Sequence, residues 1–282
     1  MTSSSNLVSV YIPTKNRLSL AIRAINSVLN QTHQPIEIIV VDDCSELAQY
    51  QALCAEFVDY DNVHFSRNSQ PLGACATRNK AINRATGEFV TGLDDDDYFK
   101  PHRIATLLAA YDDKYAFVCD NNSMFKYYQF GDISVKKILK SNYVGNQIFT
   151  QRYKILALNG YDENFPAYQD YDLWVRLIER FGKAKKIQGC SQIINTSRDT
   201  LRISDNSDTV RKAVALFLAK HAHLYAHQEK SVLYVKVKYA HYYKENDFMD
   251  VKSLIKAISL GNTRINIMIL IILFRKFMAL IQ

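Results

Sequence analysis

Short apolar runs and amphipathic stretches alternate along the first half of the chain. Residues 8–13 (VSVYIP) and 36–43 (IEIIVVDD) are rich in β-branched residues and apolar on both faces, which is typical of buried parallel strands. Between these runs, apolar residues recur at helical spacing: Ala21, Ile22, Ile25, Val28 and Leu29. The alternation of strand and helix predicts an α/β domain with a doubly wound, mostly parallel sheet.

The same pattern continues along the chain and becomes less regular from about residue 131. It predicts six further elements: strands at 63–66, 88–93 and 117–121, and helices at 74–85, 170–181 and 210–226. We expect one more helix to begin at Pro101, because the fixed φ of proline suits a first helical turn.

Three polar segments each follow directly after a predicted strand: residues 14–17, 42–45 and 94–97. Because the carboxyl ends of parallel strands meet at one edge of a sheet, we expect these segments to line one cleft. The third segment lies in GLDDDDYFKP and places four aspartates side by side. Aspartate oxygens are hard ligands that suit Mg²⁺, Mn²⁺ or Ca²⁺. The alternative is a solvated acidic turn that holds no ligand.

Charge is distributed unevenly along the chain. The net charge is +7, and residues 210–282 alone carry 12 Lys and Arg against four Asp and Glu. The first 209 residues are therefore close to neutral. We predict a main domain at residues 1–209 and a basic, helical C-terminal region at 210–282 that meets an anionic partner.

The end of this basic region is strongly apolar. Residues 265–281 (INIMILIILFRKFMALI) are short for a membrane span and contain Arg275 and Lys276. A helix that lies in the interface of an anionic membrane is the favoured interpretation. The alternative is a helix that docks on the main domain or on a second subunit.

The cysteines and the N-terminal residues indicate the cellular compartment in which the protein is expected. The five cysteines are scattered and include no close metal-type pair, which favours a reducing compartment. The opening segment, MTSSSNLVSVYIPTKNR, contains no secretory signal. We therefore expect a cytoplasmic protein that lies peripherally on the inner face of the cytoplasmic membrane.

Four segments taken together resemble a known family. In chain order they read VSVYIPTKNR, SVLNQTHQPIEIIVVDDCS, GACATRNKAINRATGEFVTGLDDDDYFKP and YQDYDLWVRL. Their order and spacing over roughly the first 180 residues are similar to those of family 2 glycosyltransferases, which is more specific than a single Asp-x-Asp motif. The resemblance implies a GT-A fold of the type used by bacterial surface-polysaccharide enzymes.

The resemblance also implies positions for a UDP-sugar donor. Pro13 and Thr14 would lie along the uridine, with Arg17 nearby. Asp42 or Asp43 would accept a hydrogen bond from the uracil N–H. Arg17 could instead be an ordinary surface arginine, since exposure is the common case for this residue type.

The same resemblance divides the roles within the acidic segment. Asp96 would bind Mn²⁺ or Mg²⁺ under the diphosphate, and Asp94 would lie near the ribose or a metal-bound water. Asp95 takes the variable middle position, and Asp97 would position the loop or the donor sugar. Arg78 would approach the base or the diphosphate with a permanent positive charge, unless it too is a surface arginine.

An acceptor site is implied at QDYDLWVRL. Asp170 would act as general base, and Gln169 would orient the acceptor by hydrogen bonding. Asp172 is the rival base, because either aspartate could simply cap the helix. Trp174 would form the floor of the acceptor pocket or pack in the core, and core packing is the favoured interpretation. Arg202, farther along the chain, would reach the diphosphate.

These sites combine into a predicted function. We expect an inverting, metal-dependent transfer of one sugar, with glucose as the first choice, from a UDP-sugar to a lipid-linked saccharide. The pathway would be lipopolysaccharide, O-antigen or capsule synthesis, and no nucleic-acid partner is expected. Two alternatives stay open: a non-catalytic, membrane-peripheral module that binds a nucleotide sugar or polysaccharide, and a nucleotidyltransferase.

Overall fold

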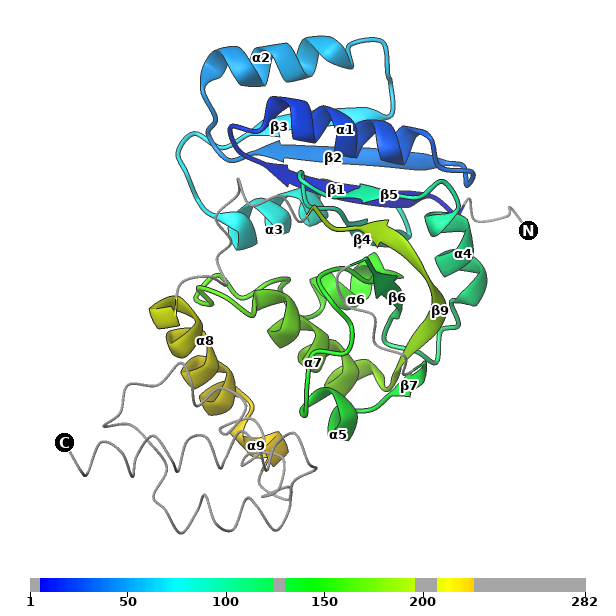
Figure 1. Cartoon of the computed structure of the whole chain (residues 1–282), viewed down its shortest axis with the longest axis vertical. Helices are drawn as coiled ribbons and strands as arrows, with labels where there is room; N and C mark the ends of the chain where they lie inside the picture. The colour runs from blue at the N-terminus through cyan, green and yellow to red at the C-terminus, as the bar shows by residue number, and fades with distance from the viewer. Residues whose placement is uncertain (1–5, 124–129, 196–206, 226–282) are drawn as a thin grey trace, which may run out of the picture. The chain divides into compact units, whose positions relative to one another are not determined.

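The computed structural model describes residues 6–123, 130–195 and 207–225. The chain groups into two compact units. The first unit comprises residues 1–135, 142–164 and 169–199. The second comprises residues 136–141, 165–168 and 200–282. The sheet and the helices that cover it belong to the first unit (Figure 1).

A sheet of nine strands, counted over the described residues, forms the centre of the first unit. Its spatial order is β3-β2-β1-β4-β8-β6-β9-β5, and β7 pairs with β9. The strands are β1 (Val8–Thr14), β2 (Ile36–Asp42), β3 (Val63–Arg67), β4 (Phe89–Gly92), β5 (Tyr98–Phe99), β6 (Val118–Asn122), β7 (Gly131–Ile133), β8 (Phe149–Gln151) and β9 (Ala184–Ile193). The first four strands pair in parallel, whereas β8 runs antiparallel to β4. The predicted α/β class is confirmed.

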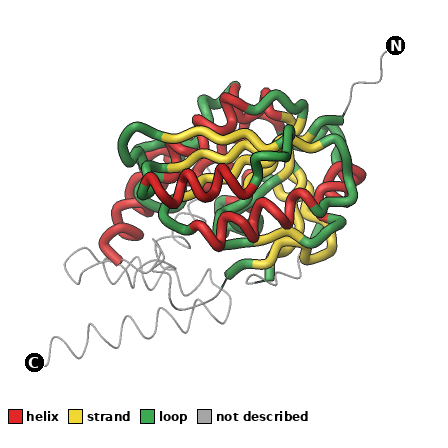
Figure 2. Tube along the Cα trace, turned by 90° about the horizontal axis from the view of Figure 1, so that it is seen from above, coloured by secondary structure: helices red, strands yellow, loops and turns green. Residues whose placement is uncertain are grey.

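Helices follow the strands as the sequence pattern predicts, and Figure 2 shows the strands running between helices. The helices of the described residues are α1 (Leu18–Leu29), α2 (Leu47–Glu56), α3 (Ala74–Arg84), α4 (Arg103–Ala110), α5 (Val135–Ile138), α6 (Arg152–Leu156), α7 (Gln169–Phe181), α8 (Ser207–Lys220) and α9 (Ala222–Tyr225). The single helix expected at 210–226 is wrong in one respect, because a turn at His221 separates α8 from α9.

The start of α4 also differs from the prediction. The helix begins at Arg103, two residues after Pro101. The Pro101 carbonyl accepts a hydrogen bond from the backbone N–H of Thr32 (2.9 Å), in the connection between α1 and β2. The neighbouring Lys100 carbonyl accepts one from the Gln31 side-chain amide (2.8 Å). Because these contacts tie the chain to another loop, it passes through a turn before the helix begins.

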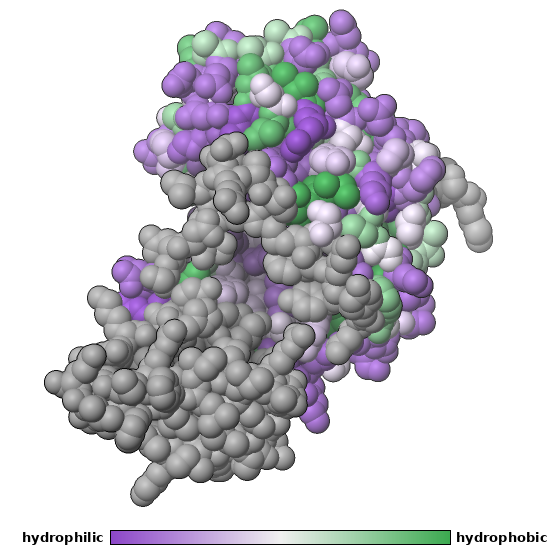
Figure 3. Space-filling model, in the orientation of Figure 1, coloured by the Kyte–Doolittle hydropathy of each residue, from purple (hydrophilic) through white to green (hydrophobic). Residues whose placement is uncertain are grey.

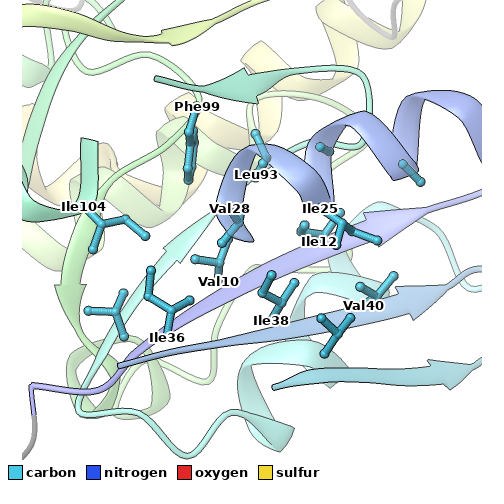
Figure 4. Packing of buried hydrophobic residues seen from close by; sticks show 14 of the residues in the cluster. Val10, Ile12, Ile25, Val28, Ile36, Ile38, Val40, Leu93, Phe99 and Ile104 are labelled. Atoms are coloured by element: carbon cyan, nitrogen blue, oxygen red, sulfur yellow. The ribbon is translucent and has the colours of Figure 1, made fainter. Parts of the chain in front are cut away.

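Both faces of the central strands are buried, as their β-branched composition predicts. On one face, Val10 and Ile12 of β1 and Ile38 of β2 pack against Ile25 and Val28 of α1 (Figure 4). All five side chains are fully buried. Helix α3 contacts the same two strands from the other side (Figure 1). This packing fixes the carboxyl ends of β1 and β2, and with them the loops that follow.

The second unit contains α8 and α9. Val210, Val214 and Phe217 form the buried side of α8. The Tyr225 hydroxyl of α9 donates a hydrogen bond to the Leu139 carbonyl (3.2 Å), which joins α9 to another segment of the same unit.

The expected membrane attachment concerns residues 265–281, which lie outside the described residues. None of the helices in the described ranges is long and apolar enough to cross a membrane. Figure 3 shows hydrophilic residues interspersed with smaller groups of hydrophobic ones over the visible surface of the described residues. The interfacial helix therefore stays a prediction.

Candidate active site

Three loops meet at the carboxyl ends of β1, β2 and β4. The Thr14 hydroxyl donates to Asp95 Oδ2 (2.8 Å), and Arg17 Nη1 donates to Asp95 Oδ1 (2.9 Å). The backbone N–H of Asp43 donates to the Thr14 carbonyl (2.8 Å), which joins the second loop to the first. Pro13 is half-buried at the end of β1. The three segments therefore share one edge of the sheet, as predicted.

The four aspartates of the acidic loop (residues 94–97) differ in exposure. The side chains of Asp94 and Asp96 are each 23% exposed, whereas that of Asp95 is 7% exposed. Asp97 is buried. Asp94 and Asp96 are therefore the two carboxylates of this loop that a ligand can most readily reach.

Arginines pair with the accessible carboxylates. Arg78 Nη2 lies 2.8 Å from Asp94 Oδ1, and Arg17 Nη1 lies 3.3 Å from Asp96 Oδ2. The Arg78 side chain is 13% exposed and stacks over the ring of Tyr161, 5.4 Å from its centroid. Burial opposes the charge of Arg78, but Asp94 outweighs it and raises the pKa of the guanidinium. Arg78 is not an ordinary surface arginine.

The two less exposed aspartates have raised pKa values. Burial raises the pKa of Asp95 to about 6, although the charge of Arg17 opposes the rise. Burial, reinforced by the charge of Asp94, raises the pKa of Asp97 to about 7. For Asp97 the negative charge of Asp94 adds to this rise, so a cation bound at this edge would relieve the repulsion between the two carboxylates.

Asp97 anchors the acidic loop to other parts of the sheet. Its Oδ1 accepts a hydrogen bond from the Asn195 backbone N–H (3.0 Å), and its Oδ2 accepts from the side-chain amides of Gln192 (2.9 Å) and Asn146 (3.3 Å). The predicted role of Asp97 in positioning the loop fits these contacts. The sequence analysis missed the three donors, because they lie in the irregular region after residue 131 and belong to no motif.

Asp42 is occupied by neighbouring groups. It is 1% exposed, and its Oδ2 accepts from the Ser45 backbone N–H (2.9 Å) and from Arg67 Nε (3.1 Å). Its Oδ1 accepts a hydrogen bond from the Ser45 hydroxyl. Asp42 therefore closes the loop after β2 and ties it to β3.

Asp43 offers a more accessible carboxylate in the same loop, with a side chain that is 10% exposed. It accepts hydrogen bonds from Leu72 N (2.7 Å), Asn68 Nδ2 (2.9 Å) and Gly73 N (3.0 Å). Burial raises its pKa, but these hydrogen bonds outweigh burial and hold the pKa below its usual value. Of the two candidates for the uracil contact, Asp43 has the better exposed carboxylate.

The acceptor-side candidate, Asp170, lies in the first turn of α7 and is half-buried. Burial raises its pKa to about 6, while the charge of Arg78 opposes the rise and that of Asp94 adds to it. Asp170 therefore lies within electrostatic range of the donor-side groups. A carboxylate with a pKa this close to neutrality is suited to act as a general base.

The rival base, Asp172, has a structural role instead. It is fully buried and pairs with Arg176 (2.8 Å), which also donates to the carbonyls of Leu158 and Gly160. An acceptor hydroxyl cannot reach a carboxylate so enclosed. Gln169, by contrast, is half-buried beside Asp170 in the first turn of α7.

Trp174 packs in the core, as the favoured interpretation predicts. It is fully buried, and its ring lies 5.8 Å from that of Phe117 and 6.2 Å from that of Tyr161, measured between centroids. Its Nε1 donates a hydrogen bond to the Gly145 carbonyl (3.0 Å). Trp174 therefore packs in the core, where it holds the loop that contains Gly145, and it does not form the floor of a pocket.

The accessible carboxylates fit a hard divalent cation. Mg²⁺ in particular is usually held by one or two carboxylates together with water and substrate phosphates, and Asp94 and Asp96 can supply that protein share. Within the described residues, no group of three or more His, Cys, Asp or Glu side chains is arranged to hold a metal alone. A cation here would need oxygens from a bound diphosphate. The predicted phosphate ligand Arg202 lies outside the described residues.

Comparison with protein sequences gives matches over much of the chain. A profile described as "Glycosyl transferase family 2" matches residues 9–167. An Escherichia coli K12 protein named as a colanic acid biosynthesis glycosyl transferase, WcaA, is 36% identical over 218 residues, which cover 71% of this chain and 76% of that protein. A Campylobacter jejuni protein named GalNAc(5)-diNAcBac-PP-undecaprenol beta-1,3-glucosyltransferase is 30% identical over 183 residues, which cover 60% of this chain and 59% of that protein.

Comparison with solved structures identifies the fold as GT-A. Residues 1–349 of TarS from S. aureus, in complex with UDP-GlcNAc, match with a TM-score of 0.67 and 17% identity, covering 93% of this chain and 83% of that one. The mannosyltransferase PcManGT from Pyrobaculum calidifontis, in complex with GDP-Man and Mn²⁺, matches with a TM-score of 0.65 and 16% identity. That match covers 99% of this chain and 81% of the other.

Proposed function

The chain belongs to glycosyl transferase family 2, and from this premise we propose that it transfers one sugar from a UDP-sugar to a lipid-linked saccharide. One observation carries the proposal. Two accessible carboxylates, Asp94 and Asp96, lie at the strand-end edge, and Asp94 is within electrostatic range of a third carboxylate, Asp170, whose pKa is raised. Sugar transfer needs a site that stabilises the leaving diphosphate and a base that takes the proton of the acceptor hydroxyl.

The donor nucleotide would lie along the loops after β1 and β2. Pro13 and Thr14 would line the uridine. Asp43 would accept the hydrogen bond from the uracil N–H, since its side chain is 10% exposed and that of Asp42 only 2%. The TarS structure, which shares the fold, holds UDP-GlcNAc. Arg78 would supply positive charge for the diphosphate, and its pairing with Asp94 holds it at the required edge.

A divalent cation, Mn²⁺ or Mg²⁺, would be held by Asp96 with Asp94 beside it. When bound, such an ion stabilises negative charge on a leaving diphosphate. The PcManGT structure holds Mn²⁺ together with GDP-Man. Arg17, which contacts both Asp95 and Asp96, keeps the loop in place from the β1 side.

Asp170 would act on the acceptor. Its carboxylate removes the proton from the attacking hydroxyl, and the acceptor oxygen forms a bond to the anomeric carbon. The bond from that carbon to the diphosphate breaks, and UDP leaves with the electron pair. Gln169, in the same helical turn, would orient the acceptor by hydrogen bonding. A single displacement of this kind inverts the anomeric centre, so that an α-linked donor gives a β-linked product.

The sequence relatives support a lipid-linked acceptor in surface-polysaccharide synthesis. One is named for colanic acid biosynthesis, and the name of another places its acceptor on undecaprenol diphosphate and its sugar as glucose. Glucose is therefore the first donor sugar to test. The basic region at residues 210–282 would bring the enzyme to the anionic inner face of the membrane that carries such acceptors.

The test is acceptor-dependent release of UDP. The purified full chain and Mn²⁺ are incubated with UDP-glucose, UDP-galactose, UDP-GlcNAc or UDP-GalNAc, each with and without an undecaprenyl-diphosphate-linked saccharide. We expect one donor to give UDP only when the acceptor is present. Tight binding of a UDP-sugar without release over a broad set of acceptors would point to a binding module. Release of pyrophosphate from a nucleoside triphosphate would point to a nucleotidyltransferase, and either outcome would contradict the proposal.

A further inference from the structure

One short segment connects the acidic loop with the helix that carries Asp170. Asn146 Nδ2 donates to Asp94 Oδ2 (3.1 Å) and also to Asp97 Oδ2 (3.3 Å). A side-chain amide nitrogen carries two hydrogens, so one residue can donate to two carboxylates at once. When both are ionised, Asp94 and Asp97 carry like charge, and an uncharged double donor between them offsets part of their repulsion.

Asn146 also helps to fix the orientation of the Asp94 carboxylate. Arg78 binds Asp94 Oδ1 (2.8 Å), and Asn146 binds Oδ2. With a separate partner on each oxygen, the plane of the carboxylate is set and does not depend on a single flexible contact. The contact to Arg78 alone would leave the second oxygen to turn toward solvent, because Asp94 is 23% exposed.

The other end of the segment is attached to α7. Trp174 Nε1 donates to the Gly145 carbonyl (3.0 Å), and the Asn142 side chain donates to the same carbonyl (3.1 Å). Asn142 Oδ1 accepts from the backbone N–H groups of Val144 and Gly145 (3.1 Å each), which closes the segment into a turn. Asn142 Nδ2 also lies 3.5 Å from Asp170 Oδ2.

We propose that residues 142–146, the bridge segment, fix the donor-side carboxylates relative to Asp170, and that Asn146 is the positioning residue for Asp94. The inference rests on the proposed function and deepens it. Asn146 touches no reacting atom in this account. It acts through Asp94, and Trp174 holds the segment that carries it.

An asparagine is required at this position for a physical reason. Alanine would remove both donated hydrogen bonds, and aspartate would place a further negative charge between two carboxylates. Because Asn146 acts on the donor only through Asp94, we expect its loss to weaken donor binding about tenfold.

The experiment compares N146A, N146D and the control N62A in the full chain. Asn62 is a half-buried asparagine that donates to the Ile36 carbonyl (3.0 Å), away from the acidic loop. The readouts are the KM values for UDP-sugar and acceptor, the Kd of UDP with Mn²⁺ by calorimetry, and the melting temperature. We expect N146A to raise the donor KM and the Kd of UDP about tenfold, N146D to raise them further, and both to change the acceptor KM by less than about twofold.

A merely structural role would show a different pattern. It would lower the melting temperature and kcat of N146A without a selective change in the donor KM, as N62A is expected to do on a smaller scale. If N146A and N146D both keep the donor KM and the Kd of UDP within about twofold of the wild type, the inference is overturned.

A second variant tests the far end of the bridge segment. W174F keeps an aromatic ring in the core and removes the hydrogen bond to Gly145. Because both changes loosen the same segment, the donor-KM effects of W174F and N146A should not multiply in the double variant. If the effects of W174F and N146A on the donor KM multiply, the bridge segment does not couple Trp174 to Asp94.

The outcomes separate the inference from the proposed function. A wild-type chain that gives no acceptor-dependent UDP release contradicts the proposed function, and the inference fails with it. An active wild type with unchanged donor kinetics in N146A and N146D contradicts the inference alone.

Discussion

The protonation of Asp170 determines, at the residue scale, how the proposed reaction depends on pH. This carboxylate interacts electrostatically with Arg78, Asp94 and Cys75. Burial is the main cause of its pKa of about 6. A base must be unprotonated, so kcat/KM, which reports groups of the free enzyme, should be nearly constant above about pH 7 and fall about tenfold per pH unit well below pH 6. The measurement is kcat/KM from pH 5 to 8. A flat profile over that range would rule out a base with this pKa.

Glu37 makes a second residue-scale prediction, which concerns stability. Its carboxylate accepts hydrogen bonds from the Ser9 hydroxyl (2.5 Å), from both the backbone and hydroxyl of Thr86 (2.6 and 2.9 Å) and from Gly87 N (2.9 Å). Burial raises its pKa, but these donors outweigh burial and the net pKa is lowered. Glu37→Ala should therefore lower the free energy of unfolding at pH 7 by about 2–3 kcal/mol.

The sign of the pH effect follows from the lowered pKa. Glu37 contributes its full stability above its unfolded pKa of about 4.3, and the contribution is lost as pH falls through the lower folded pKa. Urea denaturation at pH 7 and pH 3 should show a smaller difference between wild type and Glu37→Ala at pH 3. Glu56→Ala, at an exposed position of α2, is the control. An equal difference at both pH values would contradict the account.

At the scale of elements, α3 holds the loop that precedes α7. Asn79 of α3 donates to the Tyr161 carbonyl (2.8 Å) and accepts from the Tyr161 N–H (2.8 Å). Gly160 has a φ of 71°, and an added Cβ there would lie 2.2 Å from Asn79 Oδ1. Gly131 has a φ of 91°, but an added Cβ would meet nothing within 4 Å.

Alanine variants of these two glycines distinguish the cost of backbone strain from the cost of a steric clash. Both alanine variants place a side chain in the left-handed region, which costs about 1 kcal/mol. Only Gly160→Ala must also displace Asn79, so its loss of unfolding free energy should exceed that of Gly131→Ala by about 1–3 kcal/mol. Chemical denaturation of both variants gives the comparison. Equal losses would mean that the contact between α3 and this loop is not a tight one.

The elements also show what the sequence could predict. The strands β1 and β2 were predictable because residues buried on both faces leave a continuous apolar run, and the three polar loops followed from the rule for parallel strand ends. The start of α4 could not be predicted from the sequence, because the hydrogen bond between Pro101 and Thr32 joins residues far apart in the chain. Asn146 and Gln192 could not be predicted for the same reason, since neither periodicity nor a motif marks a donor that reaches the acidic loop from another strand or connection.

At the scale of the whole molecule, the proposed activity divides between a neutral catalytic body and a basic C-terminal region. The sheet edge of the first unit gathers the carboxylates and arginines of the proposed donor site. Residues 210–282 carry 12 − 4 = +8 of the charge and the rest of the chain −1, which would suit attachment to an anionic surface that carries the acceptor. The predicted boundary at residue 209 is a proposal that follows from this charge distribution.

The measurement that tests the central claim most directly is the turnover of D170N. The control is D132N in β7, which removes an exposed carboxylate that pairs with Lys183, the residue just before β9. The account predicts that D170N lowers kcat by at least about 100-fold with saturating UDP-sugar and acceptor, because a positioned base contributes about 10²–10⁴-fold. The Kd of UDP with Mn²⁺ should stay within about twofold of the wild type, and D132N should retain full activity. A D170N enzyme with near wild-type kcat would contradict the assignment of Asp170 as the base.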